Sequence, residues 1–425
     1  MAHFDTIIAG GGPAGSSTAT FLRQRGRSVL VLEREKFPRF HLGESLLPFA
    51  NDLFKELGVF EQIDGRYIHK PGARIIHEES GARFTYYFDT AIREGRPYAY
   101  QVPRADFDQL LLDNARKHGA DVRERHQVRD VKFLSDRVVV TARDLENDKE
   151  LVFEAPMFVD ATGRDTLLAT EHNLKVADDL VTTNVGCFTH WENCNRESGT
   201  DEGNFTLVMF DGGWWWFIPF KGNVTSVGVV FEKSYTMARK GQTPEQLYMG
   251  ALESQKEIKV LLDGATRVRP IDTTGNWSYR SRQFYGDRFL LVGDAAAFID
   301  PLFSTGVLMA LNSGKFAANA IDKALDDNDF AAARFAEYER QAHAGADLFK
   351  DLVHEFYSEN MRQLLVQSSA NPTICAVITS LLAGDVYQKS LWHSYVQKGF
   401  SRKVDLTRAP RTRSSRQSRA DKIDV

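Results

Sequence analysis

The hydrophobic pattern at the start of the chain predicts a strand, a helix and a second strand. Residues 6–9 form a short run typical of a buried strand, and a helical pattern continues to about Gln24. Gly26 is placed to end that helix, because glycine readily adopts the left-handed conformation that follows a last helical turn. Residues 28–32 form a second buried run, so this part of the chain predicts a strand–helix–strand unit.

Further along, the pattern alternates between two kinds of structure. Residues 106–118 predict a helix with one apolar face, and residues 289–292 predict a buried strand before a helix that begins near Gly306. Residues 72–99 and 184–232 instead contain short, aromatic-rich, alternating runs that predict antiparallel strands. We therefore expect two interleaved domains, followed by a mostly helical region.

Composition places the chain among ordinary soluble proteins. Its 425 residues are 43% hydrophobic and 26% charged, and the net charge of -4 gives no reason to expect a nucleic-acid or membrane partner. Three cysteines fit a reducing compartment, and their spacing fits no metal site. The chain shows neither a secretion signal nor a run of about 18 apolar residues, so we expect a cytoplasmic protein.

The last part of the chain, residues 401–425, differs from the rest. Seven Lys or Arg side chains lie between Arg402 and Arg419, with little apolar content. This composition favours a solvated, disordered tail over the alternative, a docking arm for an acidic partner.

A glycine-rich turn joins the first predicted strand to its helix. The turn consists of Gly10, Gly11, Gly12, Pro13, Ala14 and Gly15. In such a turn Gly10 allows the tight bend, Gly12 lets a pyrophosphate approach the backbone, and Gly15 lets the helix pack on the sheet. Glu33 ends the second strand, where a carboxylate can bind ribose hydroxyls. The motif predicts a dinucleotide-binding site at a helix N-terminus.

Two later segments, 160–164 and 293–294, also follow predicted buried strands. In this order they resemble the corresponding segments of the FAD-dependent aromatic hydroxylases and their relatives. The resemblance implies that the dinucleotide is FAD and that Asp294 accepts hydrogen bonds from its ribityl chain. It also implies that Arg104 contacts the cofactor, the alternative being a surface arginine at a helix start. The residues implied at the cofactor in these two segments are Asp160, Gly163, Gly293 and Asp294.

The segment 37–48 contains Gly-Glu-Ser-Leu, which looks like a segment of flavin-dependent halogenases and of some reductase relatives. This resemblance narrows the candidate families from the FAD-dependent hydroxylases and all their relatives to the flavin-dependent halogenases and those reductases. It places four further residues at the cofactor: Arg39, Glu44, Ser45 and Leu46.

A tryptophan-rich hexad begins at Trp214 and ends at Pro219. It matches the pattern Trp-x-Trp-x-Ile-Pro that marks flavin-dependent halogenases, and it contains three of the six tryptophans of the chain. The resemblance implies a wall between flavin and substrate, formed by Trp214, Trp216, Ile218 and Pro219. An aromatic strand in a domain core is the alternative.

Lys70 lies where the same family carries its catalytic lysine, just before a predicted strand that begins Gly-Ala. An ammonium group can donate hydrogen bonds to an oxidant, and burial can lower its pKa toward a reactive amine. Considered alone, Lys70 could equally be a surface lysine before a turn. Beside the tryptophan hexad we interpret it as catalytic, with Pro71 restricting it to extended conformations.

The segment 300–307 resembles the halide-binding loop of the same family. Backbone N–H groups near Ser304, Thr305 and Gly306, at a predicted helix start, would form an anion site. Pro301, in the same loop, is placed at the flavin. Other flavoproteins use a similar loop to cover the cofactor, so the loop alone does not specify halide.

Together these resemblances predict an α/β fold with a discontinuous FAD-binding domain, Rossmann-like as in glutathione reductase and p-hydroxybenzoate hydroxylase. An antiparallel-sheet substrate domain would interrupt it. The expected ranges are 1–71, 100–183 and 276–325 for the FAD domain, 72–99 and 184–275 for the substrate domain, and 326–400 for a helical region before the tail.

The resemblance implies a halogenase that uses reduced FAD, O2 and chloride or bromide to make hypohalous acid. No second nucleotide motif for NAD(P)H is evident, so we expect a separate flavin reductase to supply reduced flavin. Weaker likeness at 384–387 and 391–393 points to the branch that acts on phenols or pyrroles, often on a carrier protein. Phe356 and Tyr357 are either pocket walls or core.

Two alternatives stay open from the sequence. One is a flavin monooxygenase or flavin-dependent reductase of the same fold, and the other is a catalytically silent flavoprotein that docks a carrier protein. The sequence also leaves open the halide, the aromatic ring, the base that removes its proton and the oligomeric state, a homodimer included.

Overall fold

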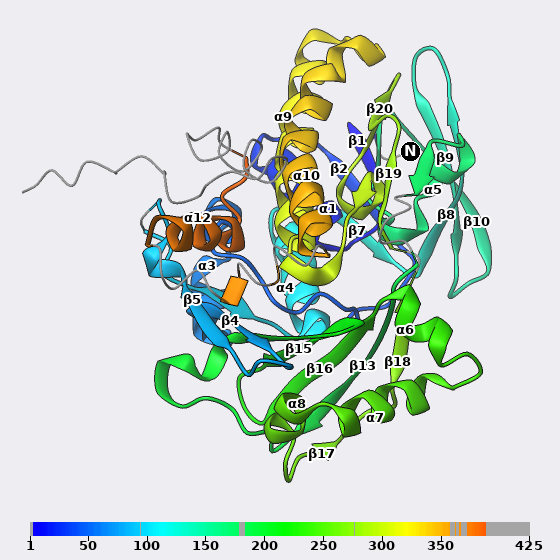
Figure 1. Ribbon diagram of the computed structural model, residues 1–425. Helices are drawn as coiled ribbons and strands as arrows, with labels where there is room; N and C mark the ends of the chain where they lie inside the picture. Colours follow the sequence, from blue (N-terminus) through cyan, green and yellow to red (C-terminus); the bar gives the residue numbers. More distant parts are fainter. Residues whose placement is uncertain are drawn as a thin grey trace, which may run out of the picture.

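A six-stranded sheet lies beside long helices in the upper half of the computed structural model (Figure 1). Its order is β20, β21, β11, β1, β2, β7, and all neighbours run parallel except β20 and β21. Every residue of β1, β2 and β11 is buried, as in a sheet covered on both faces. The strands are β1 (Thr6–Ala9), β2 (Val29–Glu33), β7 (Asp121–Glu124), β11 (Met157–Asp160), β20 (Tyr285–Gly286) and β21 (Phe289–Leu291).

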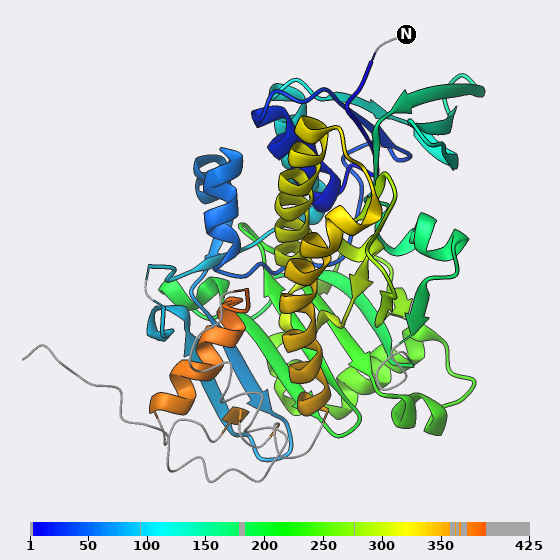
Figure 2. The ribbon, with the colours of Figure 1, turned by 90° about the horizontal axis from the view of Figure 1, so that it is seen from above.

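Helix α1 (Pro13–Gln24) packs against α4 (Arg104–Lys117) and α9 (Gly306–Asp327). A side chain at Gly314 of α9 would place its Cβ 2.5 Å from Oγ of Ser17, so this glycine allows the close approach of α1 and α9. Figure 2 shows α10 running alongside α9. Apart from three helices that accompany the second sheet described below, the other helices are α2 (Ala50–Leu57), α3 (Phe60–Arg66), α5 (Leu167–Glu171), α10 (Ala336–Phe356) and α12 (Pro372–Ala383).

A larger sheet forms the lower half of the molecule in Figure 1. Its order is β17, β13, β16, β15, β14, β4, β5, with β18 paired to β13. Its strands are β4 (Gly72–His77), β5 (Arg83–Tyr87), β13 (Val185–Glu192), β14 (Phe205–Phe210), β15 (Gly213–Pro219), β16 (Val224–Phe231), β17 (Thr266–Arg267) and β18 (Asp272–Gly275). Helices α6 (Lys233–Ala238), α7 (Pro244–Ser254) and α8 (Lys256–Leu261) accompany it.

The sequence predicts this sheet to be antiparallel, and one pairing differs. Strands β4 and β14 run parallel, with Ala73 beside Phe205. These strands come from the two separate stretches of chain that build the sheet, so no hairpin constrains their relative direction. Residues 72–77 and 205–210 therefore belong to one sheet although strands of the parallel sheet lie between them in the sequence, and the division into two interleaved domains stays a prediction.

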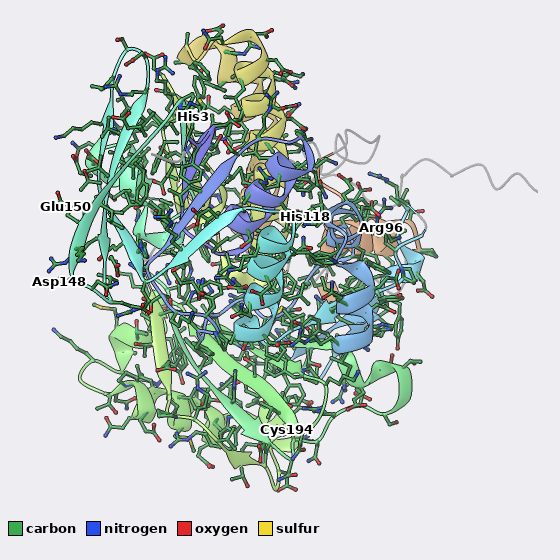
Figure 3. All side chains as sticks on the ribbon, turned by 180° about the vertical axis from the view of Figure 1, so that it is seen from behind. His3, Arg96, His118, Asp148, Glu150 and Cys194 are labelled. Carbon is green, nitrogen blue, oxygen red and sulfur yellow. The ribbon has the colours of Figure 1, made fainter. Side chains whose placement is uncertain are left out.

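Smaller sheets complete the mixed α/β fold. The meander β8–β9–β10, which the sequence analysis did not foresee, projects from the parallel sheet, and Figure 3 labels Asp148 and Glu150 at its outer edge. The remaining strands are β3 (Ile68–Lys70), β6 (Ala99–Gln101), β8 (His126–Phe133), β9 (Val138–Asp144), β10 (Lys149–Ala155), β12 (Lys175–Ala177), β19 (Tyr279–Ser281) and β22 (Ala297–Phe298).

The structure describes residues 3–93, 95–177, 183–275, 277–357, 362, 365–366 and 372–387. The predicted tail at 401–425 and the segment 391–393 lie outside these residues. Across the described part, no helix has the length and apolarity needed to cross a bilayer, and no group of three or more His, Cys, Asp or Glu side chains is arranged to hold a metal ion.

Candidate functional site

The glycine-rich turn between β1 and α1 forms one end of a large cavity. Gly10 has φ +105°, and a Cβ there would lie 2.2 Å from the carbonyl oxygen of Ala161. A Cβ on Gly15 would lie 1.9 Å from the carbonyl oxygen of Gly10, so both glycines are required by close packing. Gly12 differs, because the nearest atom to its Cβ position is Nη2 of Arg39 at 3.6 Å. Gly12 therefore keeps an open face beside a guanidinium.

The carboxylate of Glu33 ties the end of β2 to this turn. It is 5% exposed, and it accepts hydrogen bonds from the backbone N–H of Gly11 at 2.6 Å and of Glu35 at 2.7 Å. Glu33 also lines the cavity, as expected for a residue beside a bound nucleotide.

Two guanidinium groups share one buried carboxylate at the next part of the wall. Arg104 binds Asp108 through Nε at 2.7 Å and Nη2 at 3.0 Å, and Arg39 binds it through Nη1 at 3.1 Å. Burial alone would raise the pKa of Asp108, but the two guanidiniums lower it below its ordinary value. His41 beside them is neutral at pH 7, because burial and then Arg104 lower its pKa to about 4. The cluster leaves net positive charge on the wall, suited to phosphate groups.

The cavity has a volume of about 1020 Å³ and extends from the glycine turn to the tryptophan strand. Most of the residues proposed from the sequence meet along it, although they come from distant parts of the chain. Those that line it are Gly10, Gly12, Pro13, Ala14, Glu33, Arg39, Glu44, Ser45, Arg104, Gly163, Trp214, Trp216, Ile218, Asp294, Pro301, Ser304, Thr305 and Gly306.

Other proposed residues lie behind the wall and shape it. Asp160 is fully buried, and its carboxylate accepts hydrogen bonds from Thr162 and from the N–H of Leu168, so it holds the turn whose later residues face the cavity. Gly293 has φ +57° and its N–H donates to Ser313. The full set of proposed residues that do not line the cavity is Gly15, Leu46, Lys70, Asp160, Pro219 and Gly293.

Strand β15 explains how one tryptophan-rich segment can form both wall and core. Because side chains alternate between the two faces of a strand, Trp214, Trp216 and Ile218 face the cavity. Trp215 instead packs into a second core, with its ring 5.0 Å from that of Tyr248. Gly228 on β16 makes room for the wall, since a Cβ there would lie 2.2 Å from the ring of Trp216. Three residues of the hexad therefore lie on the cavity wall, Pro219 does not, and a separation of flavin from substrate by this wall stays a prediction.

Lys70, at the end of β3, is buried immediately behind the cavity wall and 2% exposed. Its Nζ donates hydrogen bonds to Oγ of Ser45 at 2.8 Å and to the carbonyl oxygen of Leu46 at 2.9 Å. It also lies 5.5 Å and 5.4 Å from the ring centres of Phe88 and Phe205. In the described part of the chain no acid pairs with it, and burial lowers its pKa to about 7. The surface-lysine alternative is wrong.

The predicted anion turn lies between a 3-10 helix (Pro301–Phe303) and α9. Ser304 adopts the left-handed conformation, with φ +57°, and directs the chain into the helix. The first backbone N–H groups of α9 have no acceptor within the helix, as at any helix start. Among the described residues, no atom beyond the neighbouring residues and backbone of α9 lies within 4 Å of a Cβ placed on Gly306, which lines the cavity, so this end of the helix is open.

Asp300 is a cavity residue that the sequence analysis did not single out, although it begins the predicted halide loop. Its carboxyl group is buried and accepts hydrogen bonds from Nε1 of Trp277 at 3.2 Å and from the hydroxyl of Tyr357 at 3.4 Å. Trp214 donates to the same hydroxyl at 3.1 Å. Tyr357 thus braces the wall from behind, whereas Phe356 is core, and neither side chain lines the cavity.

Comparisons with known proteins show which family the chain resembles. A family model described as tryptophan halogenase matches residues 5–89 and 73–364. A 1H-pyrrole-2-carbonyl-[peptidyl-carrier protein] chlorinase of Pseudomonas fluorescens is 33% identical over 409 residues, covering 90% of each chain. The corresponding brominase of Pseudoalteromonas luteoviolacea is 30% identical over 392 residues, covering 92% of this chain and 94% of its own.

Solved structures of halogenases have the same fold as this chain. The flavin-dependent brominase Bmp2 superposes with a TM-score of 0.85 at 28% identity, covering 94% of this chain and 98% of the other. The myxobacterial chondrochloren halogenase CndH superposes with a TM-score of 0.78 at 31% identity, covering 90% and 97%.

Proposed function

The chain belongs to the flavin-dependent halogenases of the tryptophan halogenase family, and on this premise we propose how its own residues act and on what. The proposed reaction oxidises chloride or bromide to hypohalous acid with reduced FAD and O2, and then halogenates a pyrrole or phenol through Lys70. The monooxygenase, reductase and silent-flavoprotein alternatives lose their support, since the relatives are halogenating enzymes.

The cavity fits FAD in shape and in charge. The open face of Gly12 beside Arg39 suits a pyrophosphate, and the carboxylate of Glu33 suits the adenosine ribose. Asp294 is half-buried in the cavity wall, and burial raises its pKa to about 6, so its carboxyl group is suited to hydrogen-bond a ribityl hydroxyl. We assign the FAD domain to residues 1–71, 100–183 and 276–325, because its sheet and the glycine turn come from these ranges.

Flavin, when bound and reduced, supplies the electrons with which O2 oxidises the halide. The residues of the chain place the reactants for that step. Halide would bind the N–H groups at Ser304, Thr305 and Gly306, at the end of α9 that opens on the cavity. Trp214 and Trp216 fill the wall beyond it and keep the aromatic substrate from the flavin.

Lys70 would then meet the hypohalous acid on the far side of that wall. The observation that carries the proposal is a buried lysine with no acid partner among the described residues. It is held by Ser45 and Leu46 and lies 5.4 Å from the ring centre of Phe205, on strand β14 that pairs with the tryptophan strand. With a pKa near 7, both its ammonium and its amine forms exist at neutral pH. It can therefore orient hypohalous acid by donating a hydrogen bond, or take the halogen as a haloamine.

We infer that the aromatic substrate is carried on a carrier protein, because two relatives that match about nine-tenths of the chain are named for pyrrole-2-carbonyl carrier proteins. A separate flavin reductase would supply reduced FAD. The test combines the protein with FAD, a reductase, O2, bromide or chloride, and a pyrrolyl carrier protein, followed by mass spectrometry of the thioester. Free pyrrole-2-carboxylate is the matched substrate control. Hydroxylated product formed without halide, or no halogenated product with any electron-rich ring, would reject the proposal.

A further inference from the structure

The carboxyl group of Asp300 lies in the cavity wall and has no part in the function proposed above. It is 3% exposed, and its hydrogen-bond donors are all uncharged. Oδ1 accepts from the N–H of Leu302 at 2.9 Å, and Oδ2 accepts from Nε1 of Trp277 at 3.2 Å and from the hydroxyl of Tyr357 at 3.4 Å. Three neutral donors hold the group in place without neutralising a negative charge on it.

The arginines of the cavity wall interact with a different carboxyl group. Arg104 of α4 and Arg164 after β11 act on Asp294, and among the described residues no Lys, Arg or His forms an ion pair with Asp300. Tyr357, at the end of α10, is the titratable group in contact with it. Burial and the carboxylate raise the pKa of Tyr357 well above its ordinary value, so it stays a neutral donor. Burial raises the pKa of Asp300 to about 7.

Asp300 also belongs to the turn that would hold the halide. Its side chain caps the 3-10 helix Pro301–Phe303, and the next residue, Ser304, turns the chain into α9. Asp300, Ser304, Thr305 and Gly306 all line the same cavity. A carboxylate in this turn would repel an anion at the helix start, and the repulsion is strong where water is excluded. A neutral carboxyl group would not.

We propose that Asp300 is a positioning residue that couples halide binding at the Ser304–Gly306 turn to the uptake of one proton. This inference rests on the proposed function, since it takes that turn as the halide site. Halide and a proton bind together: the anion goes to the backbone N–H groups and the proton to the Asp300 carboxylate. The pair adds no net charge to the buried turn.

The coupling predicts a definite pH dependence of halide affinity. Below the pH at which Asp300 titrates, the carboxyl group is already neutral and the Kd for halide is independent of pH. Above it, each bound halide must bring one proton, so the Kd rises by up to about tenfold per pH unit. The slope of log Kd against pH equals the number of protons taken up.

The test measures bromide binding to the protein loaded with oxidised FAD. Sodium bromide is titrated at constant ionic strength from pH 6 to pH 9, and the change in flavin absorbance gives the Kd. We expect a slope that grows from zero toward one in the wild-type protein, and a slope near zero in Asp300→Asn with a Kd close to the low-pH value. Asp351→Asn is the matched control, because burial also raises the pKa of that carboxyl, which lies on α10 and does not line the cavity.

A second variant guards against loss of folding in Asp300→Asn. Tyr357→Phe removes a donor to the carboxylate, so it should move the onset of the pH dependence to higher pH. A wild-type Kd without pH dependence, an unchanged slope in Asp300→Asn, or an unmoved onset in Tyr357→Phe would each overturn the inference. Absence of bromide binding at every pH in the wild-type protein would instead reject the halide site itself.

Discussion

Oγ of Ser45 accepts a hydrogen bond of 2.8 Å from Nζ of Lys70, and of this pair it is Ser45 that lines the cavity. Lys70 itself does not line the cavity, so its ammonium group is connected to the cavity through a serine hydroxyl. Sequence resemblance had placed Ser45 at the cofactor, a role that stays a prediction. The contact with Lys70 gives Ser45 a second role in the proposed mechanism.

Replacing Ser45 by alanine should weaken halogenation even when FAD is supplied at saturating concentration. The change removes an acceptor that stabilises the ammonium, so the pKa of Lys70 should fall further, by about one unit. We expect roughly tenfold lower kcat and a pH–rate profile displaced toward lower pH. Ser80→Ala, in an exposed turn, serves as the control. A profile that keeps its wild-type position would show that Ser45 does not act through Lys70.

Replacing Lys70 by methionine should separate the two halves of the reaction. Formation of hypohalous acid needs the flavin and halide sites, which this change leaves intact, whereas transfer to the aromatic ring needs the lysine. A colorimetric trap for hypohalous acid should respond as in the wild-type protein, and halogenated thioester should fall by at least about a hundredfold. Undiminished product from the variant would remove Lys70 from the mechanism.

The same variant should alter stability in a pH-dependent way. Burial lowers the pKa of Lys70 from 10.5 to about 7, so between these values the unfolded chain binds the extra proton and stability rises with pH. The destabilising contribution of Lys70 is fully present below pH 7 and disappears above pH 10.5. Lys70→Met should therefore raise Tm at pH 6 relative to the wild-type protein, and by less at pH 9. An equal change at both pH values would contradict a buried lysine of lowered pKa.

Gly228 offers a test of the tryptophan wall that touches no proposed catalytic group. An alanine there would place its Cβ 2.2 Å from the ring of Trp216, so strand β16 or the ring must move. We expect a loss of about 1–3 kcal/mol of unfolding free energy and a changed tryptophan fluorescence spectrum. Gly250→Ala is the control, because among the described residues no atom outside the neighbouring residues and backbone of α7 lies within 4 Å of a Cβ at that position. Wild-type stability in Gly228→Ala would show that the wall is loosely packed.

Much of the fold could be predicted because local patterns determine it. The strand at 6–9 and the helix ending at Gln24 were predicted with bounds that the structure confirms, and the strands expected within 72–99 and 184–232 include β5 and β16. Each depends on residue periodicity or on a glycine with positive φ. The parallel pairing of β4 and β14 could not be predicted in this way, because it joins strands more than a hundred residues apart.

In the candidate site too, local sequence patterns predict some features, and contacts between distant residues determine the others. The glycine turn carries its geometry in six consecutive residues, so its position in the cavity wall followed from the sequence. The environment of Asp300 depends on Trp277 and on Tyr357, which lies 57 positions away, and no local pattern reports it. The burial of Lys70 behind Ser45 likewise depends on a contact across 25 positions.

The alternation along β15 has a consequence for attempts to change what the enzyme accepts. Positions 214, 216 and 218 shape the cavity, while positions 215 and 217 belong to a separate core shared with α7. The even-numbered side chains are 1%, 4% and 6% exposed, so varying them reshapes the cavity and also removes core contacts. Varying the odd-numbered ones changes the second core without altering a residue of the cavity wall, so five adjacent codons should be treated as two interleaved sets.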